Sequence, residues 1–303
     1  MGYDPGAVRV ASCPPSRLRR FGEATARQRT VSSTAMTRAV RLALTGVFSS
    51  VMCLVPAPAR AADLQPRTAQ AFDNYAGDMT RDFVSRAQKN SSARRCDGVI
   101  TARAGNGDGI LNVPDGLIHH WLALAFVRGA TLKDVDRVAR DYSAYPKVYK
   151  SVVSTKVLSQ QGDTYRVLIR LKEDAGLTAV LDVRSAVEYR TQRDGSITAI
   201  SKSEEIHQVQ NYGKPDESPL PVGRDSGYLW RAHTLTHFVA EENGVFIVME
   251  TLGLSRRFPP LTGWIIEPIA RRIGRKSVEG SLDEFLTAIR RSASLPAPKS
   301  PCS

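Results

Sequence analysis

Residues 227–254 read GYLWRAHTLTHFVAEENGVFIVMETLGL. Apolar, aromatic and β-branched side chains dominate both halves of this segment, and the chain turns at Glu242-Asn243-Gly244. An Asn-Gly pair between two such runs is typical of a β-hairpin. The segment therefore predicts two antiparallel strands, over residues 227–240 and 244–254.

The chain before this hairpin continues the pattern. Runs rich in valine, isoleucine, threonine and tyrosine alternate with short turns such as Gly162-Asp163, so successive strands pair in antiparallel order. The further strands are predicted at residues 117–127, 151–159, 164–172, 177–190 and 196–209.

Helices are predicted on either side of these strands. Residues 66–89 and residues 277–291 each place apolar side chains on one helical face. A short helix over residues 131–142 begins at Thr131, whose hydroxyl suits an N-cap. Another helix is expected over residues 261–273.

The order of elements is strand, small helix, antiparallel meander and final helix, without βαβ alternation and without an internal repeat. It predicts one α+β domain, in which a curved antiparallel sheet wraps around a long C-terminal helix and an N-terminal helical extension precedes it. Architectures of this kind tend to enclose a cavity between sheet and helix. We therefore expect an internal apolar cavity that holds a hydrophobic small molecule.

Four phrases carry a resemblance to a known family. They are GLIHHW (116–121), DYSAYPKVY (141–149), GYLWR (227–231) and ETLGLSR (250–256). With them, residues 112–292 resemble the START-like superfamily, which includes polyketide cyclases and coenzyme Q-binding proteins, and within it a set of exported bacterial proteins. The resemblance implies a helix-grip fold with an apolar cavity and no particular reaction. The sequence departs from that set at Gly274, where a proline is expected, so we expect the helix before it to end loosely.

Candidate ligand-binding residues come from the strand pattern and from the resemblance. Trp230, Thr234 and Phe238 share one face of the strand 227–240, which predicts a cavity wall, although such aromatics are more often ordinary core. Tyrosines around the small helix border the cavity mouth in the resembled fold, or else anchor that helix to the sheet. The full set is Trp121, Tyr142, Tyr149, Trp230, Thr234, Phe238, Glu250 and Arg256.

Glu250 interrupts an otherwise apolar strand, and a buried carboxylate must be paired or neutralised. Arg256 or Arg231 is the expected partner. The residue is either a polar group at the cavity or one half of a buried ion pair. An alternative function follows from the first option: a cavity enzyme of the polyketide cyclase/dehydratase type, with Glu250, a histidine such as His119 and Arg256 performing proton transfer.

Metal, cofactor and nucleic-acid sites are not expected. His119 and His120 are adjacent on a strand and point to opposite faces, and no metal-binding spacing is present. Residues 1–61 hold nine arginines against two acidic residues, so they carry +7 of the net charge of +12 and the other 242 residues carry +5. That surplus forms no Lys/Arg run and is typical of a solvated surface.

The front of the chain predicts export. Met36, Arg38 and Arg41 precede an apolar run over residues 42–55, and Ala59-Arg60-Ala61 provides a cleavage site. We expect residues 1–35 to be a non-native or disordered extension, 36–61 a signal peptide, 62–111 a helix and connector, 112–292 the START-like domain and 293–303 a flexible tail. The mature protein would be periplasmic or secreted, with transient membrane contact left open. Cys96 and Cys302 would form a disulfide or remain free thiols.

Overall fold

The computed structural model describes residues 62–90, 96–98, 100–105, 107–174, 178–257 and 260–298, with the backbone alone over 260–273. The expected extension and signal peptide, residues 1–61, lie outside this part, as do residues 299–303. Their assignments stay predictions.

Two helices follow the two-residue strand β1 (Ala62–Asp63) at the start of the described chain. They are α1 (Pro66–Arg81) and α2 (Phe83–Lys89), which divide the predicted helix 66–89 at Asp82, where the backbone leaves the helical region. Their apolar faces are buried, with Phe72 and Phe83 each 2% exposed.

A large antiparallel sheet follows, and its strand order among the described residues is β2-β4-β12-β11-β8-β7-β6-β5, with β3 on β4 and β9 on β8. A separate pair joins β1 (Ala62–Asp63) to β10 (Arg224–Asp225). The strands are β2 (Thr101–Ala104), β3 (Ile110–Val113), β4 (Gly116–Arg128), β5 (Val152–Gln161), β6 (Thr164–Asp174), β7 (Thr178–Thr191), β8 (Ile197–Gln210), β9 (Ser218–Pro219), β11 (Arg231–Glu241) and β12 (Gly244–Arg256).

Helices lie between β4 and β5 and after β12. They are α3 (Leu132–Arg140), η2 (Tyr142–Ala144), α4 (Tyr145–Val148) and α5 (Pro260–Ser292). Thr131 caps α3 as predicted, in a reciprocal capping box with Asp134. The prediction of two separate final helices is wrong, because α5 runs without interruption through Gly274.

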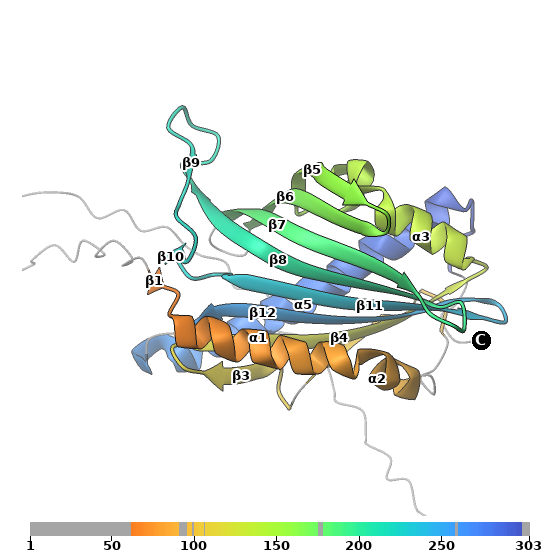
Figure 1. Ribbon diagram of the computed structural model, residues 1–303, viewed down its shortest axis with the longest axis horizontal. Coiled ribbons are helices and arrows are strands. Elements are labelled where there is room, and N and C mark those ends of the chain that lie inside the picture. Colours follow the sequence, from red (N-terminus) through yellow and green to blue (C-terminus); the bar gives the residue numbers. More distant parts are fainter. Residues whose placement is uncertain are drawn as a thin grey trace, which may run out of the picture. The chain divides into compact units, whose positions relative to one another are not determined.

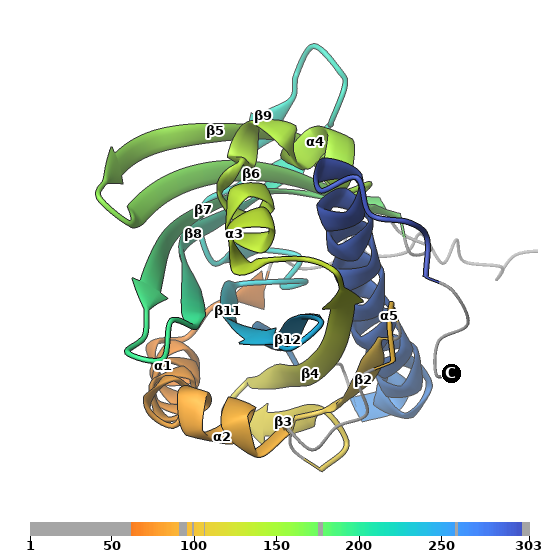
Figure 2. The ribbon, with the colours of Figure 1, turned by 90° about the vertical axis from the view of Figure 1, so that its right-hand side faces the viewer.

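The predicted architecture is confirmed: the sheet is strongly curved and wraps around a long C-terminal helix (Figures 1 and 2). Figure 2 shows the sheet bending from β5 to β2 with α5 closing the open side and α1 and α2 outside. α5 and α3 therefore cover the concave face, and α1 and α2 cover the convex face. No helix of the described part is both long and apolar enough to cross a membrane.

The two-residue period of β12 separates two cores. Val245, Ile247 and Met249 face the concave side and pack with α3 and α5. Phe246 and Val248 face the convex side and pack with Phe83 of α2. Both faces of the central strands are thus buried, which decides where the polar groups of these strands can lie.

Candidate functional site

A cavity of about 220 Å³ lies between the concave face of the sheet, the α3–α4 segment and α5. Aromatic and aliphatic side chains form most of its wall, together with a few hydroxyls. The lining residues are Ala139, Tyr142, Tyr145, Tyr149, Ile169, Val187, Tyr189, Ala199, Ser201, Thr234, Thr236, Phe238, Met249, Ser281, Leu282 and Phe285.

Three of the lining tyrosines are fixed around one carbonyl. Tyr145 and Tyr189 each donate a hydrogen bond to the backbone oxygen of Ala139, at 2.6 and 2.8 Å. The Tyr142 hydroxyl lies 3.1 Å from that of Tyr189. Because Tyr189 has already given its hydrogen to Ala139, Tyr142 is the donor of this pair.

Burial keeps these phenols neutral. It raises the pKa of Tyr142 to about 12, and it raises the pKa of Tyr145, Tyr149 and Tyr189 as well. At neutral pH all four therefore remain hydrogen-bonding groups without charge. Tyr149 is different from the other three because its hydroxyl has no hydrogen-bond partner among the described residues.

The sheet supplies a second group of hydroxyls on the same cavity. Ser201 of β8 and Thr234 of β11 are register partners, and both side chains line the cavity. Thr236 follows on the same face of β11. Within the described chain these three hydroxyls make no hydrogen bond, so each can form one with a ligand in the cavity.

The cavity can therefore bind an apolar molecule and orient a polar end of it. For scale, an engineered cavity of about 150 Å³ in another protein holds a benzene ring. The described lining residues carry no charged side chain, so the wall suits the uncharged part of a ligand.

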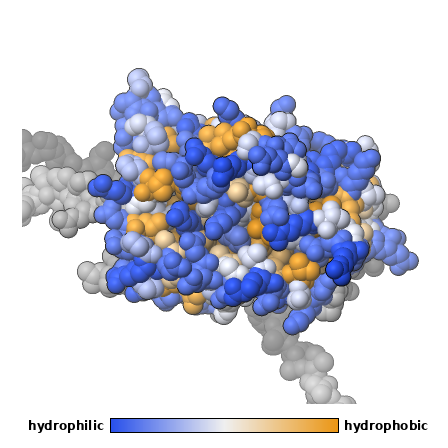
Figure 3. Space-filling model, viewed as in Figure 1, coloured by the Kyte–Doolittle hydropathy of each residue, from blue (hydrophilic) through white to orange (hydrophobic). Residues whose placement is uncertain are grey.

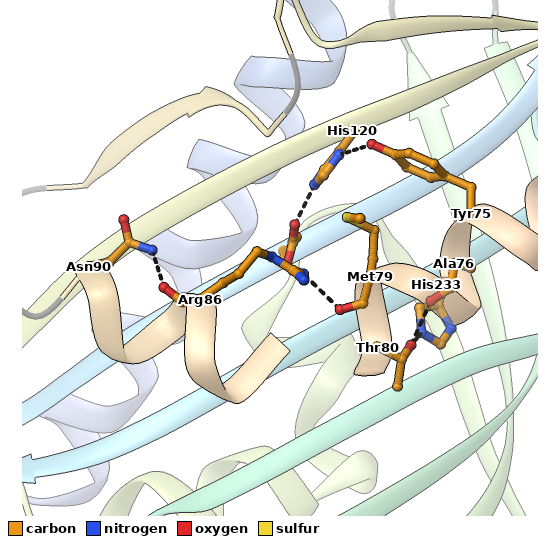
Figure 4. Close-up of polar contacts among 9 residues, drawn as sticks. Tyr75, Ala76, Met79, Thr80, Arg86, Asn90, His120 and His233 are labelled. Atoms are coloured by element: carbon orange, nitrogen blue, oxygen red, sulfur yellow. Dashed lines mark hydrogen bonds and ion pairs between the residues drawn. The ribbon is translucent and has the colours of Figure 1, made fainter. Parts of the chain in front are cut away.

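A separate polar cluster is buried on the convex face, between α1–α2 and the sheet (Figure 4). Glu250 accepts hydrogen bonds from Nε2 of His120 at 2.5 Å and from Arg86 at 2.6 Å. The Tyr75 hydroxyl lies 2.7 Å from Nδ1 of His120. His120 itself is 1% exposed, and Gly105 makes room for it, since a Cβ there would lie 2.1 Å from its Nε2.

The protonation of this cluster follows from its contacts. Burial alone would raise the pKa of Glu250, but hydrogen bonds from His120 and Arg86 outweigh burial and lower it. The carboxylate is thus ionised at neutral pH. Because an ionised carboxylate only accepts hydrogen bonds, Nε2 of His120 is the donor to Glu250.

The structure places the predicted ligand-binding residues in two groups. Tyr142, Tyr149, Thr234 and Phe238 line the cavity. That these four side chains contact a ligand stays a prediction.

The other predicted ligand-binding residues lie elsewhere. Trp230 packs on α1 in the convex-face core, because residues 227–230 precede the strand and the alternation does not extend to them. Trp121 belongs to the concave-face core but is not among the lining residues of the cavity, and its Nε1 has no partner in the described part. The Cβ of Arg256 packs against Gly227.

The predicted role of Glu250 as a polar group at the cavity is wrong, since its side chain points to the convex face. Its partners are Arg86 and His120, whereas Arg256 or Arg231 was expected. His119 lies on the opposite face from His120 and contacts Ser255, 2.8 Å from its hydroxyl. The candidate catalytic group Glu250, His119 and Arg256 is therefore not assembled at the cavity.

The sequence interpretation missed Tyr189, Ser201, Met249 and Phe285, all of which line the cavity. Alternation places Tyr189 with Val187 on the strand 177–190 and Ser201 with Ala199 on the strand 196–209, and the register between the two strands brings these four to one face. No sequence signal says which of the two buried faces is hollow.

Comparisons with known proteins give structural neighbours only. No family model matches the sequence, and no curated protein matches it. A STAR-related lipid transfer protein from Xanthomonas axonopodis has 18% identity and a TM-score of 0.43, covering 64% of this chain and 99% of that one. Human StAR-related lipid transfer protein 5 has 14% identity and a TM-score of 0.42 over 73% and 99%. The Zhui aromatase/cyclase from Streptomyces has 11% identity and a TM-score of 0.41 over 57% and 95%.

Proposed function

We propose that this protein binds a hydrophobic small molecule in the cavity between the sheet and α5, as a carrier or sensor of a lipid, isoprenoid or polyketide-like compound. The observation that carries the proposal is the pairing of an aromatic, uncharged wall with the hydroxyls of Ser201 and Thr234, which make no hydrogen bond within the described chain. The wall favours apolar atoms, and the hydroxyls accept or donate one hydrogen bond each to a carbonyl or hydroxyl of the ligand.

The size of the cavity limits the ligand. A volume of about 220 Å³ suits a molecule of one or two rings or a short isoprenoid chain. A lipid with two long acyl chains needs a larger cavity than the one present.

A carrier or sensor is favoured over the enzyme alternative by the position of the ionisable groups. Glu250 and His120 form a hydrogen-bonded pair, but that pair contacts Arg86 of α2 and Tyr75 of α1, on the other side of the sheet from the cavity. The described lining residues include neutral phenols and hydroxyls and no carboxylate or histidine that could transfer a proton.

We place this activity outside the cytoplasm. The proposal is supported by the signal-like segment over residues 36–61 and by Cys96, which is disulfide-bonded. Disulfides persist in oxidising compartments. Cys302, its predicted partner, lies outside the described residues.

Native mass spectrometry of the protein purified from its own host tests the binding proposal. We expect a non-covalent adduct that Ala199→Phe abolishes, because Ala199 lines the cavity and a phenyl ring would occupy it. Ala240→Phe on the exposed end of β11 is the matched control and should retain the adduct. An adduct that survives Ala199→Phe in a folded protein would contradict the proposal.

A further inference from the structure

The edge strand β5 is exposed to solvent on both of its faces. Eight of its ten residues are exposed, which is unusual for a strand of a large sheet. Val153, Val157 and Leu158 are 38%, 43% and 40% exposed. Figure 3 shows an apolar patch over this strand, bordered by hydrophilic surface.

The charges next to these side chains are positive. Lys147 and Lys150 lie on and just after α4, Lys156 lies on β5, and all three are exposed. Residues 147–161 contain no acidic residue. Of the carboxylates near this segment, Glu284 contacts Lys150 and Asp163 pairs with Arg140.

We infer that β5 and the adjoining end of α4 form a docking surface for a bilayer that carries anionic phospholipids. Exposed aliphatic side chains enter the acyl boundary while flanking lysines contact the headgroups, and these two contributions add. The inference concerns an interaction surface and does not depend on which molecule the cavity holds.

The geometry of β5 favours a membrane over another strand as its occupant. Val153 and Leu158 are the residues skipped in the pairing of β5 with β6, so each sits at an irregularity of the ladder. Bulges and a lysine on an edge strand oppose the addition of a further strand. The side chains of β5 can still contact a bilayer, because such a contact does not require hydrogen bonds between paired strands.

The docking surface adjoins the cavity. The amide of Val152 donates a 3.1 Å hydrogen bond to the carbonyl of Tyr149, and the side chain of Tyr149 lines the cavity. Tyr149 also follows Lys147 and precedes Lys150. A membrane bound at β5 would therefore lie next to one wall of the cavity.

Vesicle co-sedimentation of the full chain tests the inference, with phosphatidylcholine vesicles and vesicles that also contain phosphatidylglycerol. The combined variant Val153→Ser, Val157→Ser and Leu158→Ser should bind the anionic vesicles at least about tenfold less than the wild type. Replacing Lys147, Lys150 and Lys156 by glutamine should cost about fivefold per lysine at low salt. The matched control removes three equally exposed side chains elsewhere, in Tyr212→Ser, Val222→Ser and Tyr228→Ser, and should bind as the wild type does.

All variants retain residues 1–61, so differences between them report on the described surface alone. Wild-type protein that does not prefer anionic vesicles overturns the inference. So do β5 variants that bind these vesicles as well as the wild type does, or a control variant whose binding falls as much as that of the β5 variants. Sedimentation should show that the serine variant keeps the wild-type oligomeric state. If it instead separates a wild-type dimer, the occupant of β5 is a second copy and not a bilayer.

Discussion

At the scale of single residues, the carboxylate of Glu250 is a buried charge held by two partners. It is 4% exposed and bonded to both His120 and Arg86. Removing one partner of a buried ion pair leaves the other charge uncompensated in a medium that solvates it poorly.

Glu250→Gln should therefore lower the free energy of unfolding at neutral pH by about 3 kcal/mol. The measurement is urea denaturation followed by circular dichroism. The control is Glu188→Gln, whose exposed pair with Arg190 should contribute less than about 1 kcal/mol. Equal losses in the two variants would mean that the buried cluster adds no stability of its own.

The effect of Glu250 should depend on pH in a defined direction. Its pKa is lowered below the usual 4.5, so its contribution is complete above pH 4.5 and is lost as the pH falls through the folded-state value. The stability gap between wild type and Glu250→Gln should therefore narrow only below pH 4.5. A gap that narrowed between about pH 7 and 5 would contradict this assignment.

The buried His233 should change the stability of the protein in a higher pH range than Glu250 does. Its Nε2 lies 2.9 Å from the Thr80 hydroxyl, which already donates to Ala76, so Nε2 is the donor and Nδ1 has no partner in the described part. Burial lowers the pKa of His233 from 6.5 to about 4. The unfolded chain takes up a proton below pH 6.5 and the folded chain does not, so stability is lost as the pH falls from 6.5 towards 4.

His233→Gln keeps a donor for Thr80 and removes this titration. The loss of unfolding free energy between about pH 7 and 5 should be smaller than in the wild type by about 2 kcal/mol. Denaturation curves at the two pH values provide the measurement. An unchanged loss would mean that other groups, such as the half-buried His119 and the buried His237, account for all of it.

The hydroxyl of Thr234 should matter for binding and not for folding. Thr234→Val keeps the side-chain shape and removes a group that makes no hydrogen bond in the described protein. Affinity for the co-purified ligand should fall about fivefold, which corresponds to one hydrogen bond of about 1 kcal/mol. Titration calorimetry would measure this, with the exposed Thr164→Val as control. Equal affinity in both variants would remove Thr234 from the site.

At the scale of elements, α5 depends on a glycine in its middle. A Cβ on Gly274 would lie 2.7 Å from Nε1 of Trp121, closer than two such atoms approach. The indole is packed in the concave-face core, so it cannot easily move away. Gly280 belongs to the same helix, but nothing lies within 4 Å of its Cβ position.

Gly274→Ala should therefore destabilise the protein by about 1–3 kcal/mol, despite the higher helix propensity of alanine. Gly280→Ala should stabilise it by about 0.5–1 kcal/mol through that propensity. Thermal unfolding of the two variants is the measurement. Stabilisation by both would show that α5 does not pack closely on Trp121.

Elements with a clear period were predictable from the sequence. The strands from 164 to 210 and the hairpin of β11 and β12 were located to within a few residues, because turns such as Gly162-Asp163 separate them. The short strands β2 and β3 were missed, since they lie in a turn-rich segment without alternation. The start of β11 was placed four residues early, and this error put Trp230 on the wrong face.

At the scale of the whole described domain, the sequence predicted the α+β helix-grip architecture. It did not predict which face of the sheet borders the cavity and which face is covered by α1 and α2. Most of the central strand β12 is buried on both sides, by α5 within the curve and by α1 and α2 outside it. A strand of this kind is apolar throughout, so its sequence does not reveal which side holds the cavity. Of the two predictions for Glu250, the one that placed it at the cavity failed for this reason. The buried ion pair is the one present, and it joins Glu250 of β12 to Arg86 of α2.

The central claim is that the concave side of the sheet holds a ligand-binding cavity. Methyl NMR of the protein titrated with 1-naphthol, a neutral aromatic alcohol, tests it most directly. Saturable shifts are predicted for Met249, Thr234 and Ile169, which line the cavity, and not for Val248 and Leu252 on the convex face. A two-ring molecule such as 1-naphthol matches the volume of the cavity. Shifts confined to the convex-face methyls, or no saturable shift at all, would contradict the account.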